Sequence, residues 1–235
     1  MAFSAAIVGE SGTGKSTSIF NIPELGIQGL PPEETIIINP AAKPLIAKGA
    51  NKLYPIGKLS DGGRNIHERK ASKIARIINL VDTDPKYSYI KYIVVEDAQY
   101  LQAFVFMNKI QEKNYDRFND TGEAAWLPLK AMVESVRTDL FIFFIYHLER
   151  INDSDVKIKT SGKVVDNYLT VEGLFSIVLY THREFDPVTK TGKYSFTTQN
   201  NGFNTAKSPP GMFDDYYIPN DLGFVAKKMQ EFYCE

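Results

Sequence analysis

Short apolar stretches alternate along the chain with segments in which apolar residues recur every three or four positions. The apolar stretches, each suited to one buried strand, are residues 3–8, 35–39, 89–95, 140–146 and 175–180. Helical spacing is found in residues 68–81, 98–113 and 125–136, and a last helix is expected at 221–233. Strands that alternate with helices predict an α/β fold in which helices cover a mostly parallel sheet.

The segments between these elements are polar or rich in Gly and Pro. We expect loops at 41–63 and 114–123, and an exposed loop or hairpin in the charged stretch 149–163. Residues 189–192 are expected to form a turn. Residues 193–198 would then pair antiparallel with the segment before the turn and form a hairpin in the C-terminal part of the chain. No internal repeat or linker is evident, so residues 1–235 are expected to form a single domain.

One Gly-rich segment carries a recognisable chemical pattern. Residues 9–17 match G-x-x-x-x-G-K-[ST], the phosphate-binding loop of P-loop NTPases, and they follow directly on the first predicted strand. The glycines allow backbone N–H groups to surround a phosphate, Lys15 adds a positive charge near the β and γ phosphates, and Ser16 offers a hydroxyl to Mg²⁺. A helix opening at residues 16–21 would add its positive N-terminal end. The sequence therefore predicts ATP and Mg²⁺ as cofactors, with these nucleotide-binding residues: Glu10, Ser11, Gly12, Thr13, Gly14, Lys15, Ser16 and Thr17.

Two carboxylates follow the strand at 89–95. In P-loop enzymes one acidic residue at the end of an apolar strand beside the P-loop strand holds the metal, and another orients the attacking water. Glu96 and Asp97 are the candidates for these two roles, and the sequence leaves open which residue takes which. The alternative is that Asp97 caps the N-terminus of the next helix.

A histidine ends the fourth predicted strand. Ligands bind at the carboxyl ends of parallel strands, so His147 is a candidate sensor of the γ-phosphate, with a structural histidine as the alternative. The other two histidines, His67 and His182, lack metal-ligand spacing to any cysteine or carboxylate pair, and no zinc site is predicted.

Net charge, cysteine content and apolar run length exclude some classes of protein and leave the predicted nucleotide site unchanged. The net charge of −1 gives no global attraction to nucleic acid or membrane, so any contact with DNA must come from local basic segments. The single cysteine, Cys234, excludes an intramolecular disulfide. No apolar run approaches the length of a membrane span and no signal peptide is evident, so we expect a soluble cytoplasmic protein.

Several segments together resemble the phage-encoded AAA/RecA-like ATP-binding proteins, a group that includes the RecA-core ATPases of phage recombination modules. The resemblance extends over nearly the whole chain, and its segments are 9–17, 94–101, 144–149, 157–163, 171–175 and 199–213. It implies a RecA-like P-loop core, use of ATP and Mg²⁺, self-assembly, and work on single-stranded DNA in the cytoplasm of an infected host cell. A single-strand-binding protein or an annealing protein is a further partner that it suggests. Glu96 stands where these proteins more usually have Asp, which leaves the metal carboxylate open.

Basic residues outside the P-loop supply candidate contacts with DNA and with a neighbouring subunit. Lys157, Lys159 and Lys163 lie in the charged stretch, where alternating lysines can contact successive phosphates; a solvated loop is the alternative. In RecA-like assemblies a basic residue after the fifth strand can reach a neighbour's γ-phosphate, and Lys207 is the first candidate for this role. The cations on the outer side of the 68–81 helix are expected to be an ordinary solvated face: Arg69, Lys73 and Arg76.

The leading functional hypothesis is a DNA-dependent ATPase that acts on single-stranded DNA in phage recombination or replication, as an oligomer with ATP bound between subunits. Its candidate catalytic residues are Lys15, Glu96, Asp97, His147 and Lys207. An alternative is a nucleotide-gated assembly or loading factor with weak or no hydrolysis. A small-molecule kinase is a third class, against which the sequence shows no Arg-rich lid.

Overall fold

The computed structural model describes residues 1–235 except 112–115, 153–154, 162, 189 and 235, and it leaves the side chains of 163 and 164 undescribed. The strands are β1 (Phe3–Gly9), β2 (Thr35–Ile38), β3 (Asn65–Ile66), β4 (Tyr92–Val95), β5 (Phe141–Arg150), β6 (Val156–Ile158), β7 (Ile177–Asp186), β8 (Thr191–Thr197) and β9 (Tyr217–Pro219). The α-helices are α1 (Ala50–Leu53), α2 (Ala71–Thr83), α3 (Gln99–Asn108), α4 (Asp116–Glu134), α5 (Lys163–Tyr168) and α6 (Leu222–Cys234).

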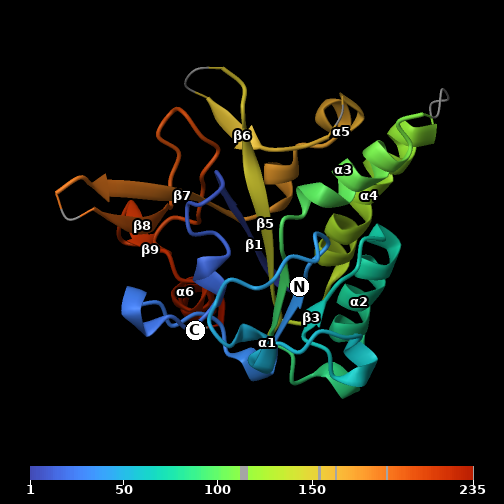
Figure 1. Ribbon diagram of the computed structural model, residues 1–235, viewed down its shortest axis with the longest axis horizontal. Helices are drawn as coiled ribbons and strands as arrows, with labels where there is room; N and C mark the ends of the chain where they lie inside the picture. The colour runs from blue at the N-terminus through green and yellow to red at the C-terminus, as the bar shows by residue number, and fades with distance from the viewer. Residues whose placement is uncertain (112–115, 153–154, 162, 189, 235) are drawn as a thin grey trace.

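A mostly parallel sheet forms the centre of the molecule, in the order β3-β2-β4-β5-β1-β7-β8-β9 (Figure 1). β1 is parallel to both β5 and β7, and β4 is parallel to both β2 and β5. Strand β8 runs antiparallel to both of its neighbours, β7 and β9, and β6 folds back antiparallel on the end of β5. The predicted α/β class, with helices over a mostly parallel sheet and an antiparallel C-terminal hairpin, is confirmed.

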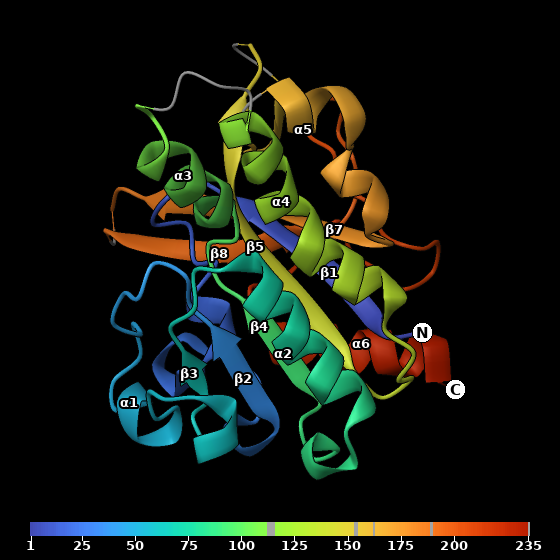
Figure 2. The same ribbon diagram turned by 90° about the vertical axis from the view of Figure 1, so that its right-hand side faces the viewer.

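The central strands are buried on both faces, which explains why they are continuous apolar runs rather than alternating ones. Successive residues of β1 enter opposite layers: Ala6 and Val8 pack beneath α2, α3 and α4, whereas Ala5 and Ile7 pack toward α1 and α6. Figure 2 shows α2 and α4 on the near face of the sheet and α6 behind it. Burial on both faces holds the carboxyl ends of β1, β4 and β5 at fixed positions relative to one another.

The predicted helix at 16–21 is wrong. Only a 3₁₀ turn, Thr17–Ile19, follows the P-loop, and the chain then turns back through a bridge between Ile22 and Ile27. Pro23 explains the early stop, because a proline disfavours the α conformation in the residue before it, and Ile22 indeed has φ −133° and ψ 85°. No long helix dipole is therefore available to the P-loop.

Two predicted loops contain helix. α4 begins at Asp116, so the part of 114–123 that the structure describes is helical, and the continuous helix carries Pro128 in its interior. The 41–63 segment contains the short helix α1, which packs through Ala50 and Tyr54 beneath the sheet. Burial beneath the sheet stabilises α1, whereas the first turns of α4 pack against the end of α3, where the Phe118 ring lies 6.2 Å from that of Phe106 and Asp120 pairs with Lys109. Among the described residues, no helix combines the length and apolarity required to cross a membrane.

Candidate nucleotide-binding site

The P-loop lies at the carboxyl end of β1 and is shaped to receive an anion. Gly12 and Gly14 adopt positive φ values of 74° and 93°, which suit glycine. Within the described chain, the backbone N–H groups from Gly12 to Ser16 donate no hydrogen bond to a protein acceptor. Such a run of free N–H groups in a tight turn forms an anion-binding concavity. A Cβ on Gly14 would lie 2.3 Å from Asn220 Nδ2, whose amide donates to Gly14 O at 3.0 Å.

Lys15 is buried inside this loop. Its ammonium donates to Gly9 O at 2.9 Å and to Glu10 O at 2.6 Å. Burial lowers the pKa of Lys15, while the nearby carboxylates of Asp97 and Glu96 act in the opposite direction. The charge is thus held by two backbone carbonyls at the mouth of the P-loop, next to the free N–H groups.

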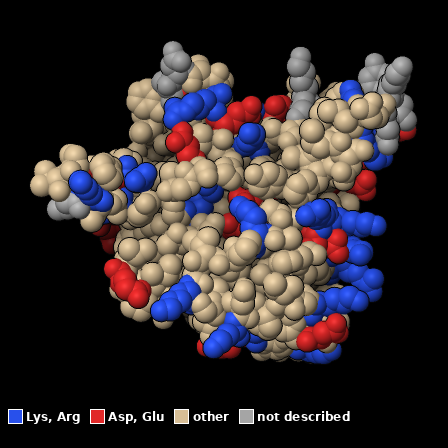
Figure 3. Space-filling model, in the orientation of Figure 1, with Lys and Arg blue, Asp and Glu red and all other residues tan. Residues whose placement is uncertain are grey.

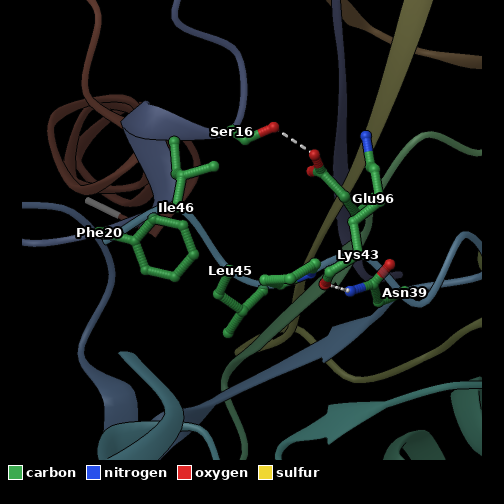
Figure 4. A pocket seen from close by; sticks show the side chains of 8 residues that line it. Ser16, Phe20, Asn39, Lys43, Leu45, Ile46 and Glu96 are labelled. Atoms are coloured by element: carbon green, nitrogen blue, oxygen red, sulfur yellow. Dashed lines mark hydrogen bonds between the residues drawn. The ribbon is translucent and has the colours of Figure 1, made fainter. Parts of the chain in front are cut away.

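Glu96 reaches the P-loop from the end of β4. Ser16 Oγ donates to Glu96 Oε1, and Figure 4 shows the carboxylate pointing at the serine. The other oxygen, Oε2, is buried and has no hydrogen-bond partner among the described residues. Burial, with the charge of Asp97 next, raises the pKa of Glu96 to about 7, although the Ser16 hydroxyl opposes this. A buried acceptor without a partner is costly and points to a missing ligand.

Asp97 is held in place by a lysine and a histidine. Its φ of 50° is unusual for a residue other than glycine, and its carboxylate is buried. Lys43 forms an ion pair with Oδ2, and His147 Nε2 lies 3.2 Å from Oδ1. Burial alone would raise the pKa of Asp97, but the hydrogen bonds from His147 and Lys43 lower it to about 2. Asp97 does not cap the next helix: α3 has Ala98 at its N-cap, without a side-chain cap.

A cavity of about 160 Å³ lies above the strand ends. It is lined by Lys15, Ser16, Lys43, Asp97 and His147, together with the P-loop residues Ser11, Gly12, Gly14 and Thr17. An adjoining hollow beside Ser16 and Glu96 is bordered by Phe20 and by the loop after β2, as Figure 4 shows. The structure thus brings Lys15, Ser16, Glu96, Asp97 and His147 to a single place.

The carboxylates do not reach the site in the way the sequence suggested. They were expected on a strand beside the P-loop strand, but β5 lies between β1 and β4. Glu96 meets Ser16 across β5 because both residues extend beyond the ends of their strands. The same intermediate position of β5 places His147 between the P-loop and Asp97.

Other predicted residues lie elsewhere. Glu10 pairs with Arg150 at the end of β5, and Thr13 Oγ1 lies 2.6 Å from Thr181 Oγ1. Lys207 bridges to Val178 at the start of β7 and does not line the cavity at the P-loop of its own chain.

The lysines of the charged stretch are not in an open loop. β6 pairs with the end of β5, so the stretch contains a hairpin, and Lys157 is ion-paired with Asp166 at 3.0 Å and Glu149 at 3.8 Å. Lys159 donates its backbone N–H to His147 O. Lys163 opens α5, and its side chain lies outside the described part of the chain.

Sequence reasoning missed three contributors to the site. Lys43 comes from the loop after β2, Gln99 Oε1 accepts from His147 N, and Asn220 supports Gly14 from the far end of the chain. Lys43 could have been found from its position shortly after a parallel strand, where ligands gather. Asn220 carries no local signal, because its contact depends on a separation of 206 residues.

Comparisons with known proteins give limited help. No protein-family model matches the chain, and no curated protein sequence matches it. Among solved structures, the chain is similar to the KaiC-like protein PH0186 from the hyperthermophilic archaeon Pyrococcus horikoshii OT3. The two share 12% sequence identity with a TM-score of 0.43, over 83% of this chain and 77% of that one.

Proposed function

We propose that this chain is a Mg²⁺-dependent ATP hydrolase built on a RecA-like P-loop core. The observation that carries the proposal is the contact of Ser16 with Glu96, in the hollow that adjoins the cavity lined by Lys15 and Asp97. Hydroxyl and carboxylate oxygens are the ligands that Mg²⁺ prefers. The free N–H groups and Lys15 are the partners that a triphosphate needs.

The donor set fits a divalent cation at Ser16 and Glu96. Glu96 Oε2 lacks a hydrogen-bond partner, and a cation would supply the opposite charge that this buried oxygen needs. When bound, the cation neutralises charge on the phosphate oxygens during transfer. Of the two carboxylates, we therefore assign Glu96 to the metal shell and Asp97 to the attacking water.

Asp97 is suited to orient that water because its own position is fixed. Lys43 and His147 hold its two oxygens, and its low pKa keeps it ionised at neutral pH. Lys15 and the backbone N–H groups would stabilise charge on the transferring phosphoryl group. His147 contacts Asp97 directly, so it is placed to report on a γ-phosphate in the same cavity.

Replacement of Lys15 tests this proposal. We expect Lys15→Ala to lower the rate of phosphate release from Mg·ATP by roughly 100-fold or more, because a preorganised positive charge is lost. Lys52→Ala removes an exposed lysine of α1 and serves as the control, with an unchanged rate. Equal turnover in the two variants would contradict the proposal.

A second candidate is a nucleotide-gated assembly or loading factor. The supporting observation is that both oxygens of Asp97 are already engaged, which leaves this carboxylate little freedom to accept a proton from water. An ATP-dependent change in particle size without phosphate release would favour this candidate over the hydrolase.

The family resemblance extends the proposal to partners. We propose that the chain self-assembles with ATP between subunits, that Lys207 approaches a neighbour's γ-phosphate, and that single-stranded DNA stimulates turnover. The setting would be phage recombination or replication in the host cytoplasm, with a single-strand-binding or annealing protein as a further partner. Turnover and particle size, measured with and without single-stranded DNA at low salt, test these points together.

A further inference from the structure

The outer face of α2 carries a row of cations. Arg69, Lys70, Lys73 and Arg76 are exposed at and after the start of the helix, and Lys86 is exposed beyond its end. Figure 3 shows Lys and Arg side chains along the right-hand edge of the molecule, where Figure 1 places α2. We call this row, with the half-buried Arg64, the α2 basic face.

Little negative charge balances this face. The ion pair found on it among the described residues joins Lys73 to Glu68 at 3.4 Å. The acidic residue within the second half of α2, Asp82, is turned inward and accepts hydrogen bonds from the backbone of Val136 and Arg137. On the β5–β6 hairpin, by contrast, Lys157 faces both Glu149 and Asp166. The local field available to a polyanion is therefore stronger over α2 than over the hairpin.

An aromatic ring lies at one end of the row. Tyr89 is 45% exposed, and the guanidinium of Arg64 lies 5.6 Å from its ring centroid. Exposed aromatic rings beside cations allow unpaired bases to stack while their phosphates meet the positive charges. A double helix keeps its bases stacked within itself, so this combination favours a single strand.

The other end of the row contacts the loop that leads to the nucleotide site. Arg69 Nε donates to Pro40 O at 3.1 Å, and its guanidinium lies 4.8 Å from the Phe104 ring centroid. Pro40 precedes Lys43 in the same loop, and Lys43 pairs with Asp97. A ligand that draws the Arg69 side chain away from Pro40 O would act on the loop whose Lys43 pairs with Asp97.

We propose that the α2 basic face binds a single strand of nucleic acid, with phosphates along the helix and a base stacked at Tyr89. The 13 residues of α2 extend about 20 Å, roughly the axial length of six nucleotides at B-DNA spacing. The proposal rests on the proposed function, because it names the surface through which single-stranded DNA reaches the ATPase.

Three matched double variants test the surface, each removing two positive charges: Lys73→Gln with Arg76→Gln, Lys157→Gln with Lys159→Gln, and Lys227→Gln with Lys228→Gln. The probe is a fluorescent oligo(dT), and anisotropy is read across a range of salt concentrations. We expect the α2 pair to weaken binding about tenfold and to reduce the salt slope by about 1.4, at roughly 0.7 for each lost phosphate contact. The control pair on α6 should bind as the wild type does.

A stacking test accompanies the charge test. Tyr89→Ala should weaken binding about tenfold, whereas Tyr89→Phe should retain it, because stacking needs the ring and not the hydroxyl. Equal binding by the α2 pair and the α6 pair would overturn the proposal, as would a loss confined to the hairpin pair. Bound Mg·ATP is measured separately for each protein, so failure of the DNA surface is distinguishable from failure of the nucleotide site.

Discussion

Buried charged side chains lie at both ends of the central sheet, but their surroundings differ. At the amino end, Arg137 donates to the carbonyls of Val81, Tyr87, Ser88 and Ile90 and pairs with Asp139. At the carboxyl end, Asp97 carries a strained backbone and Glu96 has a buried oxygen without a partner. Arg137 thus meets its acceptors within the chain, whereas one buried oxygen of Glu96 finds no hydrogen-bond partner among the described residues.

This difference separates structural charges from functional ones. A buried network whose members are all paired makes the fold more rigid, whereas an unpaired buried group costs free energy that only a ligand can recover. Functional sites are also the places where backbone strain gathers. We therefore expect changes at the carboxyl end to alter turnover more than stability, and changes at the amino end to do the reverse.

Glu96→Gln should have the largest effect on the carboxyl end. The amide keeps the shape and the Ser16 contact but removes the charge proposed to face Mg²⁺, so phosphate release should fall roughly 100- to 1,000-fold. The free energy of unfolding should stay the same or rise, because a carboxyl group whose pKa is raised to about 7 by burial is replaced by a neutral one. Turnover and thermal denaturation are measured on the same preparation. A large drop in Tm with little loss of turnover would show instead that Glu96 serves the stability of the fold and not turnover.

Arg137→Ala should have the largest effect on the amino end. It removes the guanidinium from four backbone carbonyls, of which only Tyr87 O keeps a backbone donor, Ile90 N, among the described residues. The free energy of unfolding should therefore fall by about 3 kcal/mol and the Tm by about 5–10 °C. Turnover per folded molecule should be unchanged at a temperature well below the transition. Lys227→Ala, which removes an exposed cation on α6, is the control and should shift stability by less than about 0.5 kcal/mol. Loss of turnover in the folded Arg137 variant would show that the two ends are not separable.

The sequence predicted the central strands and the P-loop because both depend on local signals, but it missed the short strands β3 and β9. Residues 3–8 and 140–146 are continuous apolar runs, and the P-loop pattern lies within nine residues. The strand order is not a local property, so the position of β5 between β1 and β4 was missed. The same holds for Lys43, which meets Asp97 across 54 residues.

The pairing of charged side chains was the property hardest to predict from the sequence. Lys157 and Lys73 look alike as lysines spaced along basic segments, and the sequence favoured the first as a DNA contact and the second as a solvated charge. The structure pairs Lys157 with two carboxylates, whereas the ion pair found on the α2 basic face among the described residues is that of Lys73 with Glu68. Whether a cation is neutralised depends on tertiary neighbours, which spacing along the chain does not report.

The smallest expected effect concerns acid stability at the amino end. Hydrogen bonds from Arg137 and Lys91 lower the pKa of Asp139 to about 2, from the ordinary value of 3.8 for an aspartate. Because the folded-state pKa is the lower one, the stabilisation is present above about pH 4 and is lost as the pH falls toward 2. Asp139 is half exposed, so its contribution should be below about 1 kcal/mol. Asp139→Asn should therefore be less stable than the wild type at pH 6 by urea denaturation, and the difference should vanish near pH 2.

The control is Asp61→Asn, which replaces an exposed aspartate that accepts a hydrogen bond from Ser60. A difference that persists unchanged at pH 2 would mean that the lost packing, rather than the charge, explains the effect.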